Sequence, residues 1–355
     1  MCVFTERAFS KMENKCVLPF IGHDYHKDSP CCLLQNKDGT KWDSKISDIN
    51  DLIDDHKKGK KSIYCNQCWK DEDVGVTSRR QRYNQLYKAH LPLAERQVKA
   101  LVIPTGNVCN LYCVTCSPNY STSWIKKQMS FKQGSQFDDD EIITEINPSD
   151  VQKIHEAEHI EFIGGETLKS FSLWRHLSTL DKATSFSLQT NGTIELNPGQ
   201  VALLQSFNNF NICFSLDGYG KIFDYLRQPA KWHQVEKNVK QYKEYFGKDR
   251  LSILFTVSNL NIFYIDNIMY ELFKLLPSNI DLNMVEAPSE MAYNNLPMHV
   301  GERVEKNNPV FFKNRNVDWS GTDESMEKLK MNLREQDNFS GLKKEKHLTE
   351  LFELI

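Results

Sequence analysis

Three cysteines, Cys109, Cys113 and Cys116, follow the spacing C-x3-C-x2-C within one short stretch. Thiolates this close together in one loop are typical ligands of an iron–sulfur cluster, and three of them would bind three of four irons. The fourth iron would keep an open position, as catalytic zinc sites do, for a substrate or cofactor. A zinc knuckle is the alternative. It needs a fourth ligand, and the nearest histidine before the loop is His90.

Five further cysteines lie in the N-terminal part of the chain: Cys16, Cys31, Cys32, Cys65 and Cys68. The last two form a chelating pair, and Cys16 with either member of the middle pair completes four ligands. Two histidines, His23 and His26, lie between Cys16 and Cys31, so a mixed Cys/His zinc site is the alternative to a cluster. The remaining cysteines, Cys2 and Cys213, stand alone, and we interpret Cys213 as a core residue of an apolar strand.

The elements that would position these residues begin near residue 98, where short apolar runs alternate with segments of helical spacing. Six strands are predicted, over residues 98–104, 159–163, 185–190, 211–216, 251–257 and 280–286. The clearest helix covers 232–246, where apolar residues recur at steps of three and four. This βαβ rhythm implies a parallel sheet, either doubly wound or a partial barrel. Polar, glycine-rich segments follow the strands, at the edge where parallel α/β folds place active sites.

Composition limits the protein classes that fit. The chain has 355 residues, 40% hydrophobic residues and a net charge of −3, which is enough apolar material for a core. We expect a small metal-stabilised domain over residues 1–97, a barrel over 98–290, and an irregular linker with a C-terminal helical segment over 291–355. The near-neutral charge argues against nucleic-acid binding. Without a long apolar run or an apolar leader, we expect no membrane span and a reducing, cytoplasmic location.

With these motifs the chain resembles the radical S-adenosylmethionine (radical SAM) enzymes, whose C-x3-C-x2-C signature follows the first strand of a partial (β/α)6 TIM-type barrel. The resemblance continues in Gly164-Gly165-Glu166, in Gln189-Thr190-Asn191-Gly192, and in Ser215-Leu216-Asp217-Gly218 followed by Asp224 and Arg227. Departures from the family pattern are a threonine before the third cysteine, where an aromatic residue is common, and a threonine after Glu166, where proline is common.

The resemblance implies roles for these segments. The catalytic [4Fe-4S] cluster would be held by Cys109, Cys113 and Cys116. The Gly164-Gly165-Glu166 segment would bind the amino group of S-adenosylmethionine, while Ser215 and Arg227 would hold its carboxylate or ribose. Asn191 would be a further cofactor-binding residue.

The N-terminal cysteines resemble a twitch domain, a shortened form of the SPASM module that carries an auxiliary [4Fe-4S] cluster. The implied ligands are Cys16, Cys31, Cys65 and Cys68. Cys31 is preferred to Cys32 because it directly follows Pro30, as in related modules. Further matching positions are Glu72, Gly75, Ser78 and Arg79.

The activity that the resemblance implies is reductive cleavage of S-adenosylmethionine to a 5′-deoxyadenosyl radical, which abstracts a hydrogen atom from a substrate. A peptide or protein is the expected substrate, and a carbohydrate or nucleotide-type small molecule is the alternative. The implied partner is a low-potential electron donor of the flavodoxin or ferredoxin type. A different class of protein, a non-enzymatic zinc-stabilised binding module, is the competing hypothesis.

Overall fold

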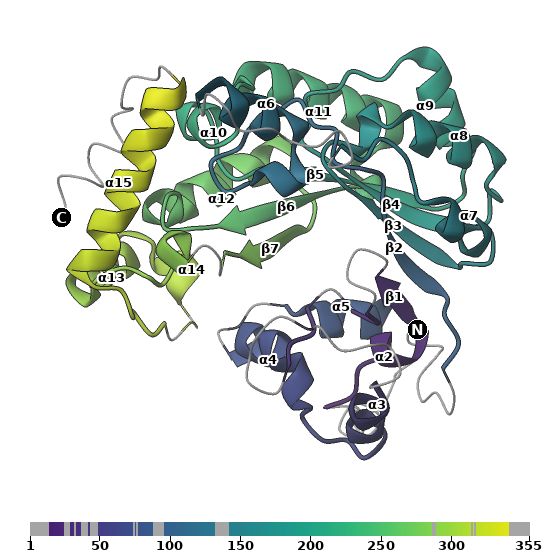
Figure 1. Ribbon diagram of the computed structural model, residues 1–355, viewed down its shortest axis with the longest axis horizontal. Helices are drawn as coiled ribbons and strands as arrows, with labels where there is room; N and C mark the ends of the chain where they lie inside the picture. The colour runs from purple at the N-terminus through teal and green to yellow at the C-terminus, as the bar shows by residue number, and fades with distance from the viewer. Residues whose placement is uncertain are drawn as a thin grey trace. The chain divides into compact units, whose positions relative to one another are not determined.

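The structure is a computed structural model, drawn as a ribbon in Figure 1. It describes residues 14–24, 29–31, 33–36, 42, 49–73, 75, 77–87, 96–131, 142–285, 289–313, 315 and 317–340. Within these ranges, no helix is both long and apolar enough to cross a membrane.

Helices and strands alternate along most of the chain. The strands are β1 (Gly22–Asp24), β2 (Ala100–Pro104), β3 (His159–Ile163), β4 (Ser185–Thr190), β5 (Phe210–Ser215), β6 (Leu251–Val257) and β7 (Ile280–Met284). The α-helices are α2 (Leu18–Ile21), α3 (Asn50–Lys57), α4 (Asn66–Asp73), α5 (Arg79–Leu86), α6 (Thr122–Phe131), α7 (Pro148–Ile154), α8 (Phe171–Thr179), α9 (Pro198–Gln205), α10 (Lys221–Leu226), α11 (Trp232–Phe246), α12 (Ile265–Leu275), α13 (Met298–Asn307), α14 (Pro309–Phe312) and α15 (Asp323–Ser340). Short 3-10 helices are η2 (Ile63–Cys65), η4 (Pro118–Tyr120), η6 (Thr167–Lys169), η7 (Lys248–Arg250), η8 (Ile262–Tyr264) and η9 (Ser289–Met291).

The strands form one sheet in the order β1-β2-β3-β4-β5-β6-β7. The pairs β1–β2, β4–β5, β5–β6 and β6–β7 are parallel. Because the order never reverses, the sheet has no topological switch point and winds in one direction, as a barrel does and a doubly wound sheet does not. The first and last strands stand at opposite ends of this order, so the fold is a partial α/β barrel and the predicted fold class is confirmed.

The chain folds into two compact units, Met1–Pro104 with Asn147–Glu161, and Thr105–Ile146 with Phe162–Ile355. The first unit has a core formed by α2, α3, the segment around Cys65 and α5. Its largest apolar side chains include Trp42, whose ring packs edge-on against Tyr64 at 5.5 Å between centroids. The three-residue strand β1 belongs to this unit, where Gly22 is in register with Ala100 of β2.

The second unit is built on a sheet that is apolar on one face. Burial alternates along β4, β5 and β6, and the buried residues include Phe186, Phe214 and Phe255. Helix α11 covers part of this face, since the Tyr242 ring lies 5.3 Å from the Phe214 ring. The predicted helix over 232–246 is therefore confirmed as α11 (Figure 1). Its buried residues include Val235, Val239 and Tyr242.

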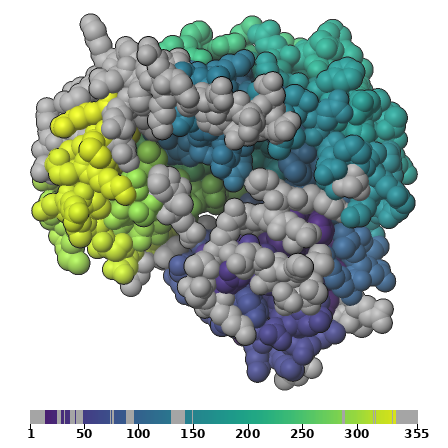
Figure 2. Space-filling view, viewed as in Figure 1, coloured from purple at the N-terminus to yellow at the C-terminus, as the bar shows by residue number. Residues whose placement is uncertain are grey.

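The region after β7 is more regular than expected. Residues 291–355 were expected to be an irregular linker followed by a C-terminal helical segment. The structure forms two helices, α13 and α14, in the part expected to be irregular, and α15 over Asp323–Ser340. The buried residues of α13 are Val300, Gly301 and Val304. The Trp319 ring packs directly against Gly301, where a larger side chain would collide with it. Helix α15 lies at the surface in Figure 2, coloured yellow. The predicted terminal helix over 348–355 lies outside the described residues.

Candidate functional site

The three central cysteines lie in a loop that directly follows β2, and all three are half-buried. The loop, residues 105–116, is pinned by its main chain: Tyr112 N–H donates to the Gln228 carbonyl at 2.7 Å and Val114 N–H to the Leu226 carbonyl at 2.8 Å. Between the cysteines, the side chains of Leu111 and Val114 are buried. Apolar anchors and main-chain hydrogen bonds therefore fix the loop, and its sulfurs remain partly accessible.

The beginning of α6 holds the first cysteine. The Thr122 hydroxyl accepts from Cys109 N–H at 3.2 Å, and the Ser123 hydroxyl donates to the Cys109 carbonyl at 2.7 Å. The Trp124 indole N–H donates to the Cys113 carbonyl at 2.9 Å. The position of two cysteine backbones is thus set by one helical turn.

The thiols of this loop are poor acids without a metal. Burial raises the pKa of Cys113 well above its ordinary value and that of Cys116 to about 11, while the Arg227 charge opposes the rise at both. Burial also raises the pKa of Cys109. These sulfurs therefore carry protons at neutral pH, and a metal must displace them to bind.

The Gly164-Gly165-Glu166 segment after β3 lies against the first part of the cysteine loop. Gly165 N–H donates to the Gly106 carbonyl at 3.0 Å and Glu166 N–H to the Val108 carbonyl at 2.9 Å. A Cβ on Gly165 would lie 2.6 Å from the Val108 carbonyl oxygen, so only glycine permits this approach. The sequence motif is thereby explained by close backbone packing next to Cys109.

The Glu166 carboxylate is buried and bound by its own chain. It accepts hydrogen bonds from Thr190 Oγ1 at 2.8 Å, Asn191 N–H at 2.7 Å and Leu168 N–H at 3.2 Å. Burial raises the pKa of Glu166, and these hydrogen bonds oppose part of that rise. The carboxylate is consequently fixed in orientation at the ends of β3 and β4.

Asn191 connects this carboxylate to the cysteine loop. Its side-chain N–H group lies 4.0 Å from Cys109 Sγ and 3.1 Å from Asn110 Oδ1, and its side-chain oxygen accepts from Thr193 N–H at 3.0 Å. The structure therefore brings Cys109, Glu166 and Asn191 together, although they come from three separate stretches of sequence.

The Arg227 charge acts on all three cysteines of the loop, and its guanidinium is already paired. Its Nε and Nη2 atoms both lie 2.8 Å from Asp217 Oδ2, and both residues are buried. Asp217 is itself fixed, because its Oδ1 accepts from Thr256 N–H at 3.2 Å and its carbonyl from the Asn261 amide at 2.9 Å. The Arg227 charge acts on the Cys113 thiol. Arg227 is thus a fixed positive charge beside the loop.

Ser215 ends β5, where it is half-buried and in register with Leu254 of β6. It alternates with the buried Phe214, so its side chain belongs to the opposite face of the sheet. Asp224, which belongs to the same motif, accepts a hydrogen bond from Trp232 N–H at 2.6 Å. It therefore supports the start of α11.

The face of β4–β6 opposite the apolar one is polar and half-buried. Its members are Ser185, Ser187, Gln189, Asn211, Cys213, Ser215, Ser252, Leu254 and Thr256. Gln189, Cys213 and Ser252 form one row across the three strands, and the Asn211 amide donates to Ser252 Oγ at 2.7 Å. The interpretation of Cys213 as a core residue was wrong, because it alternates with the buried Ile212 and Phe214. Apart from Leu254, neutral and mostly polar side chains stand where branched apolar residues fill most barrel interiors.

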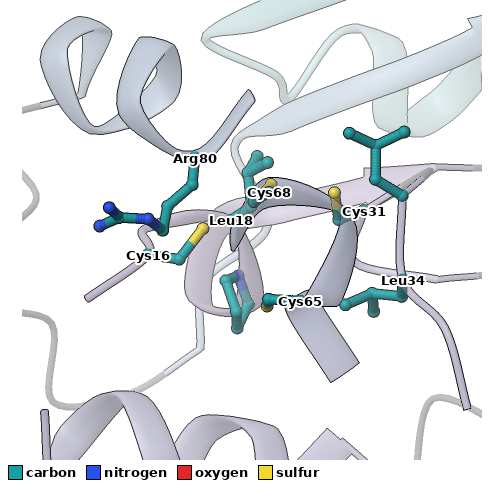
Figure 3. Close-up of a pocket in the computed structure, with 9 residues that line it drawn as sticks. Cys16, Leu18, Cys31, Leu34, Cys65, Cys68 and Arg80 are labelled. Atoms are coloured by element: carbon teal, nitrogen blue, oxygen red, sulfur yellow. The ribbon is translucent and has the colours of Figure 1, made fainter. Parts of the chain in front are cut away.

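Four N-terminal cysteines line one pocket in the first unit: Cys16, Cys31, Cys65 and Cys68 (Figure 3). Cys16 precedes α2, Cys65 ends η2 and Cys68 lies in the first turn of α4. All four are buried, and burial raises the pKa of Cys16 to about 12 and raises that of Cys65 and Cys68. Cys32 lies outside the described residues, so the preference for Cys31 stays a prediction.

The histidine nearest to this pocket was not expected from the sequence. His56 Nε2 lies 3.5 Å from Cys65 Sγ, and its Nδ1 lies 3.0 Å from the Asn14 carbonyl oxygen. His23 lies in β1 and is not among the residues that line the pocket, and His26 lies outside the described residues. Within the described ranges, no three His, Cys, Asp or Glu side chains gather closely enough to hold a single metal ion. In a cluster each thiolate binds a different iron, so its cysteines need not meet at one point.

Two partners of the site belong to recognised motifs but had no predicted role: Thr190, which binds Glu166, and Asp217, which binds Arg227. Each lies at the carboxyl end of its strand. That position was the available signal, since polar residues directly after parallel strands converge on one edge. His56 had no such signal, because only the fold of the first unit brings it to Cys65.

No family model and no curated protein matches the chain. Among solved structures, it is similar to anSMEcpe with bound AdoMet, at 21% identity, with 52% of this chain and 49% of that chain covered and a TM-score of 0.39. It is also similar to SuiB of Streptococcus suis bound to S-adenosylmethionine, at 12% identity, 80% and 67% coverage and a TM-score of 0.40. TYW1 with a lysine-pyruvate adduct gives 13% identity, 68% and 78% coverage and a TM-score of 0.34. The chain thus matches about half the length of anSMEcpe, and likeness at these scores carries no functional conclusion.

Proposed function

We propose that this protein is a radical SAM enzyme. The observation that carries the proposal is the convergence of Cys109, Glu166 and Asn191 at the carboxyl ends of β2, β3 and β4. The buried Arg227 adds a positive charge that acts on all three cysteines. A zinc knuckle would need a fourth protein ligand. The Glu166 carboxylate already accepts three hydrogen bonds from its own chain, and the other polar side chains beside the loop are an amide and a guanidinium. Such groups bind anions and sulfur, which suits an anionic cluster with one open position.

In this proposal Cys109, Cys113 and Cys116 hold a [4Fe-4S] cluster in the loop after β2. Their partial exposure suits a centre that a second molecule must reach. When bound and reduced, such a cluster cleaves S-adenosylmethionine to methionine and a 5′-deoxyadenosyl radical, which takes a hydrogen atom from the substrate. The chain's own contribution is to fix the three thiolates, to compensate charge through Arg227 and to donate from Asn191 toward Cys109.

The cofactor-binding roles follow from the same geometry. Gly164, Gly165 and Glu166 present close-packed main chain and a fixed carboxylate, which suit the ammonium group of S-adenosylmethionine. Ser215 at the end of β5 and Arg227 are proposed to face its carboxylate or ribose. Because Asp217 holds two of the guanidinium nitrogens, Arg227 would bind through its remaining N–H groups.

We propose an auxiliary [4Fe-4S] cluster on Cys16, Cys31, Cys65 and Cys68. The donor set fits, because four cysteines line one buried pocket and complete the coordination that a closed cluster needs. No histidine is among the residues that line it. This cluster would relay electrons or shape the substrate region. The electrons would come from a low-potential donor of the flavodoxin or ferredoxin type.

The proposed substrate is a peptide or protein, bound against the polar face of β4–β6. A neutral small molecule such as a carbohydrate is the second candidate. The observation that favours this second candidate is the polar face itself, whose Ser, Gln and Asn side chains offer neutral hydrogen-bonding groups. A strongly anionic substrate would find no positive charge among the nine members of this face.

The test is anaerobic reconstitution with iron and sulfide, followed by dithionite and S-adenosylmethionine. We expect about eight iron atoms per chain, four for each cluster, and formation of 5′-deoxyadenosine. Cys213→Ala is the matched control, since it removes a cysteine that belongs to neither set and should leave the iron content unchanged. Zinc without iron, or iron without cleavage of S-adenosylmethionine, would contradict the proposal and favour a binding module.

A further inference from the structure

One wall of the N-terminal cysteine pocket is formed by the beginning of α5. This helix starts after Ser78, whose side chain caps it by accepting from Gln81 N–H at 3.1 Å. The second residue of the helix, Arg80, lines the pocket beside Cys16 (Figure 3). Its side chain is 7% exposed. In this view the stem of the side chain lies beside Cys16, and the buried guanidinium points away from Cys31, Cys65 and Cys68.

Every nitrogen of this guanidinium is occupied. Nε and Nη2 donate to the two carboxylate oxygens of Glu72 at 3.0 Å and 2.6 Å, and Nη1 donates to the Lys15 carbonyl at 2.8 Å. Its carbon lies 4.5 Å from the centre of the Trp69 ring. The Ser78 hydroxyl donates to Glu72 at 2.5 Å and so fixes the carboxylate as well. Arg80 is consequently a charge of fixed position and not a mobile surface cation.

The main chain adds to this positive wall. The Arg80 N–H group donates a hydrogen bond to the Cys68 sulfur. This group is one of the helix N–H groups that have no partner inside the helix, at the end where the helix dipole is positive. The guanidinium also favours the charged forms of Cys16 and Cys65, although burial outweighs it and their pKa values stay raised. A second cation, Arg79, also favours the charged forms of Cys16 and Cys68. Acidic side chains act in the opposite direction: Asp55 at Cys65, and Asp71 and Glu72 at Cys68.

We infer that Arg80 is a positioning residue that sets the reduction potential of an iron–sulfur cluster held by Cys16, Cys31, Cys65 and Cys68, and that Glu72 anchors it. The inference rests on the auxiliary cluster of the proposed function. The step concerned is uptake of one electron from dithionite or from the electron donor, in which no bond is made or broken. Reduction adds a negative charge to a centre that already carries four thiolates. A fixed positive charge in a buried environment stabilises the reduced form more than the oxidised form.

The experiment isolates this cluster by replacing Cys109, Cys113 and Cys116 with alanine in the full-length protein. The parent variant and the same variant with Arg80→Met, Arg80→Lys or Glu72→Gln are titrated with dithionite and mediators, and the reduced cluster is measured by electron paramagnetic resonance. We expect Arg80→Met to lower the ratio of reduced to oxidised cluster at least tenfold at a given potential, which is about 59 mV for one electron. Arg80→Lys should shift the ratio less, because it keeps the charge but loses the two-pronged contact.

Glu72→Gln gives the decisive comparison. It removes a negative charge and retains an acceptor for Arg80, so the ratio should move toward the reduced form. A merely structural role would move both variants in the same direction or lower their iron content alike. Shifts of the same sign, or a potential that Arg80→Met leaves unchanged, would overturn the inference while the auxiliary cluster stands. A parent variant that binds zinc, or no iron, would overturn the auxiliary cluster and the inference together.

Discussion

The two groups of cysteines, in the N-terminal pocket and in the loop after β2, have similar neighbours but differ in number and in burial. In the first unit, four cysteines from helical segments line a buried pocket, whereas in the second unit three half-buried cysteines lie on a loop after a strand. Each site has one buried arginine held by a carboxylate, Arg80 with Glu72 and Arg227 with Asp217. The difference lies in the missing fourth thiol and in exposure. A closed, buried set suits storage or transfer of an electron, while an open, accessible set suits chemistry on a second molecule.

The largest expected effect comes from removing one cysteine of each set. Cys113→Ala should reduce the formation of 5′-deoxyadenosine to background, because the loop would keep two thiolates. Cys65→Ala should leave the loop cluster assembled and lower the iron content by about half. Iron analysis and chromatography of the nucleoside products measure both. If Cys65→Ala removed all iron, the two sites would not load independently, which would contradict the distinction drawn between them.

The two arginine anchors should differ in their contribution to stability. Asp217 and Arg227 are almost fully buried, so Asp217→Asn should lower the free energy of unfolding by about 3–5 kcal/mol. Glu72 is more exposed, and Glu72→Gln should cost about 1–2 kcal/mol. Urea unfolding followed by circular dichroism measures both, with the exposed pair Lys237–Glu195 as a control, where Glu195→Gln should cost less than about 1 kcal/mol. Equal losses of unfolding free energy in Asp217→Asn and Glu72→Gln would show that the two ion pairs do not differ in stability through their burial.

Acid should destabilise the first unit through Glu161. Burial raises the pKa of this carboxyl, but the Arg79 charge, His159 and the Tyr83 hydroxyl outweigh it and hold the pKa at about 2. A lowered pKa in the folded state stabilises the fold above the unfolded value of about 4.5, and that stability is lost as the pH falls from about 4.5 toward 2. The loss is on the order of 3 kcal/mol. The free energy of unfolding should depend less steeply on pH between about 4.5 and 2 in Glu161→Gln than in the unchanged protein. An equally steep dependence in the variant would show that Glu161 is not the group responsible.

The smallest effect compares two helix caps of the same design. Ser78 on α5 and Asn197 on α9 each form a capping box with a glutamine. Asn197→Ala should cost about 1 kcal/mol, the usual value of a cap. Ser78→Ala should cost more, because its hydroxyl also binds Glu72. Chemical unfolding of the two variants gives the difference, and equal costs would remove Ser78 from the Arg80 anchor.

The sequence predicted the sheet better than it predicted the contacts of the site. Strands β3, β4 and β6 have the predicted bounds. Burial alternates along each of them, and apolar residues recur at the buried positions. Strand β1 was not predicted, since three residues do not show a period. Helices α13 and α14 were also not predicted, and the buried residues of α13 include a glycine, Gly301.

The pairing of side chains follows from the fold and could not be read from spacing. Arg227 was expected to meet a ligand, but Asp217, ten residues earlier, holds it first. Cys213 was expected in the core because its neighbours are apolar, yet alternation turns it to the polar face. The four cysteines of the N-terminal pocket were grouped correctly as neighbours. Their arginine and His56 come from helices whose arrangement no local pattern specifies.

Helix α5 has consequences for the order in which the protein is made. One side of it, through Arg80 and Asn84, holds the peptide around Lys15, and the other side, through Arg79, binds Glu161 at 2.7 Å. Glu161 follows Arg79 by 82 residues, and the first unit is discontinuous in sequence. On a ribosome the N-terminal cysteines therefore emerge well before the strand that secures their pocket. The contact between Arg79 and Glu161 can accordingly form only after both the N-terminal cysteines and the loop cysteines have been synthesised.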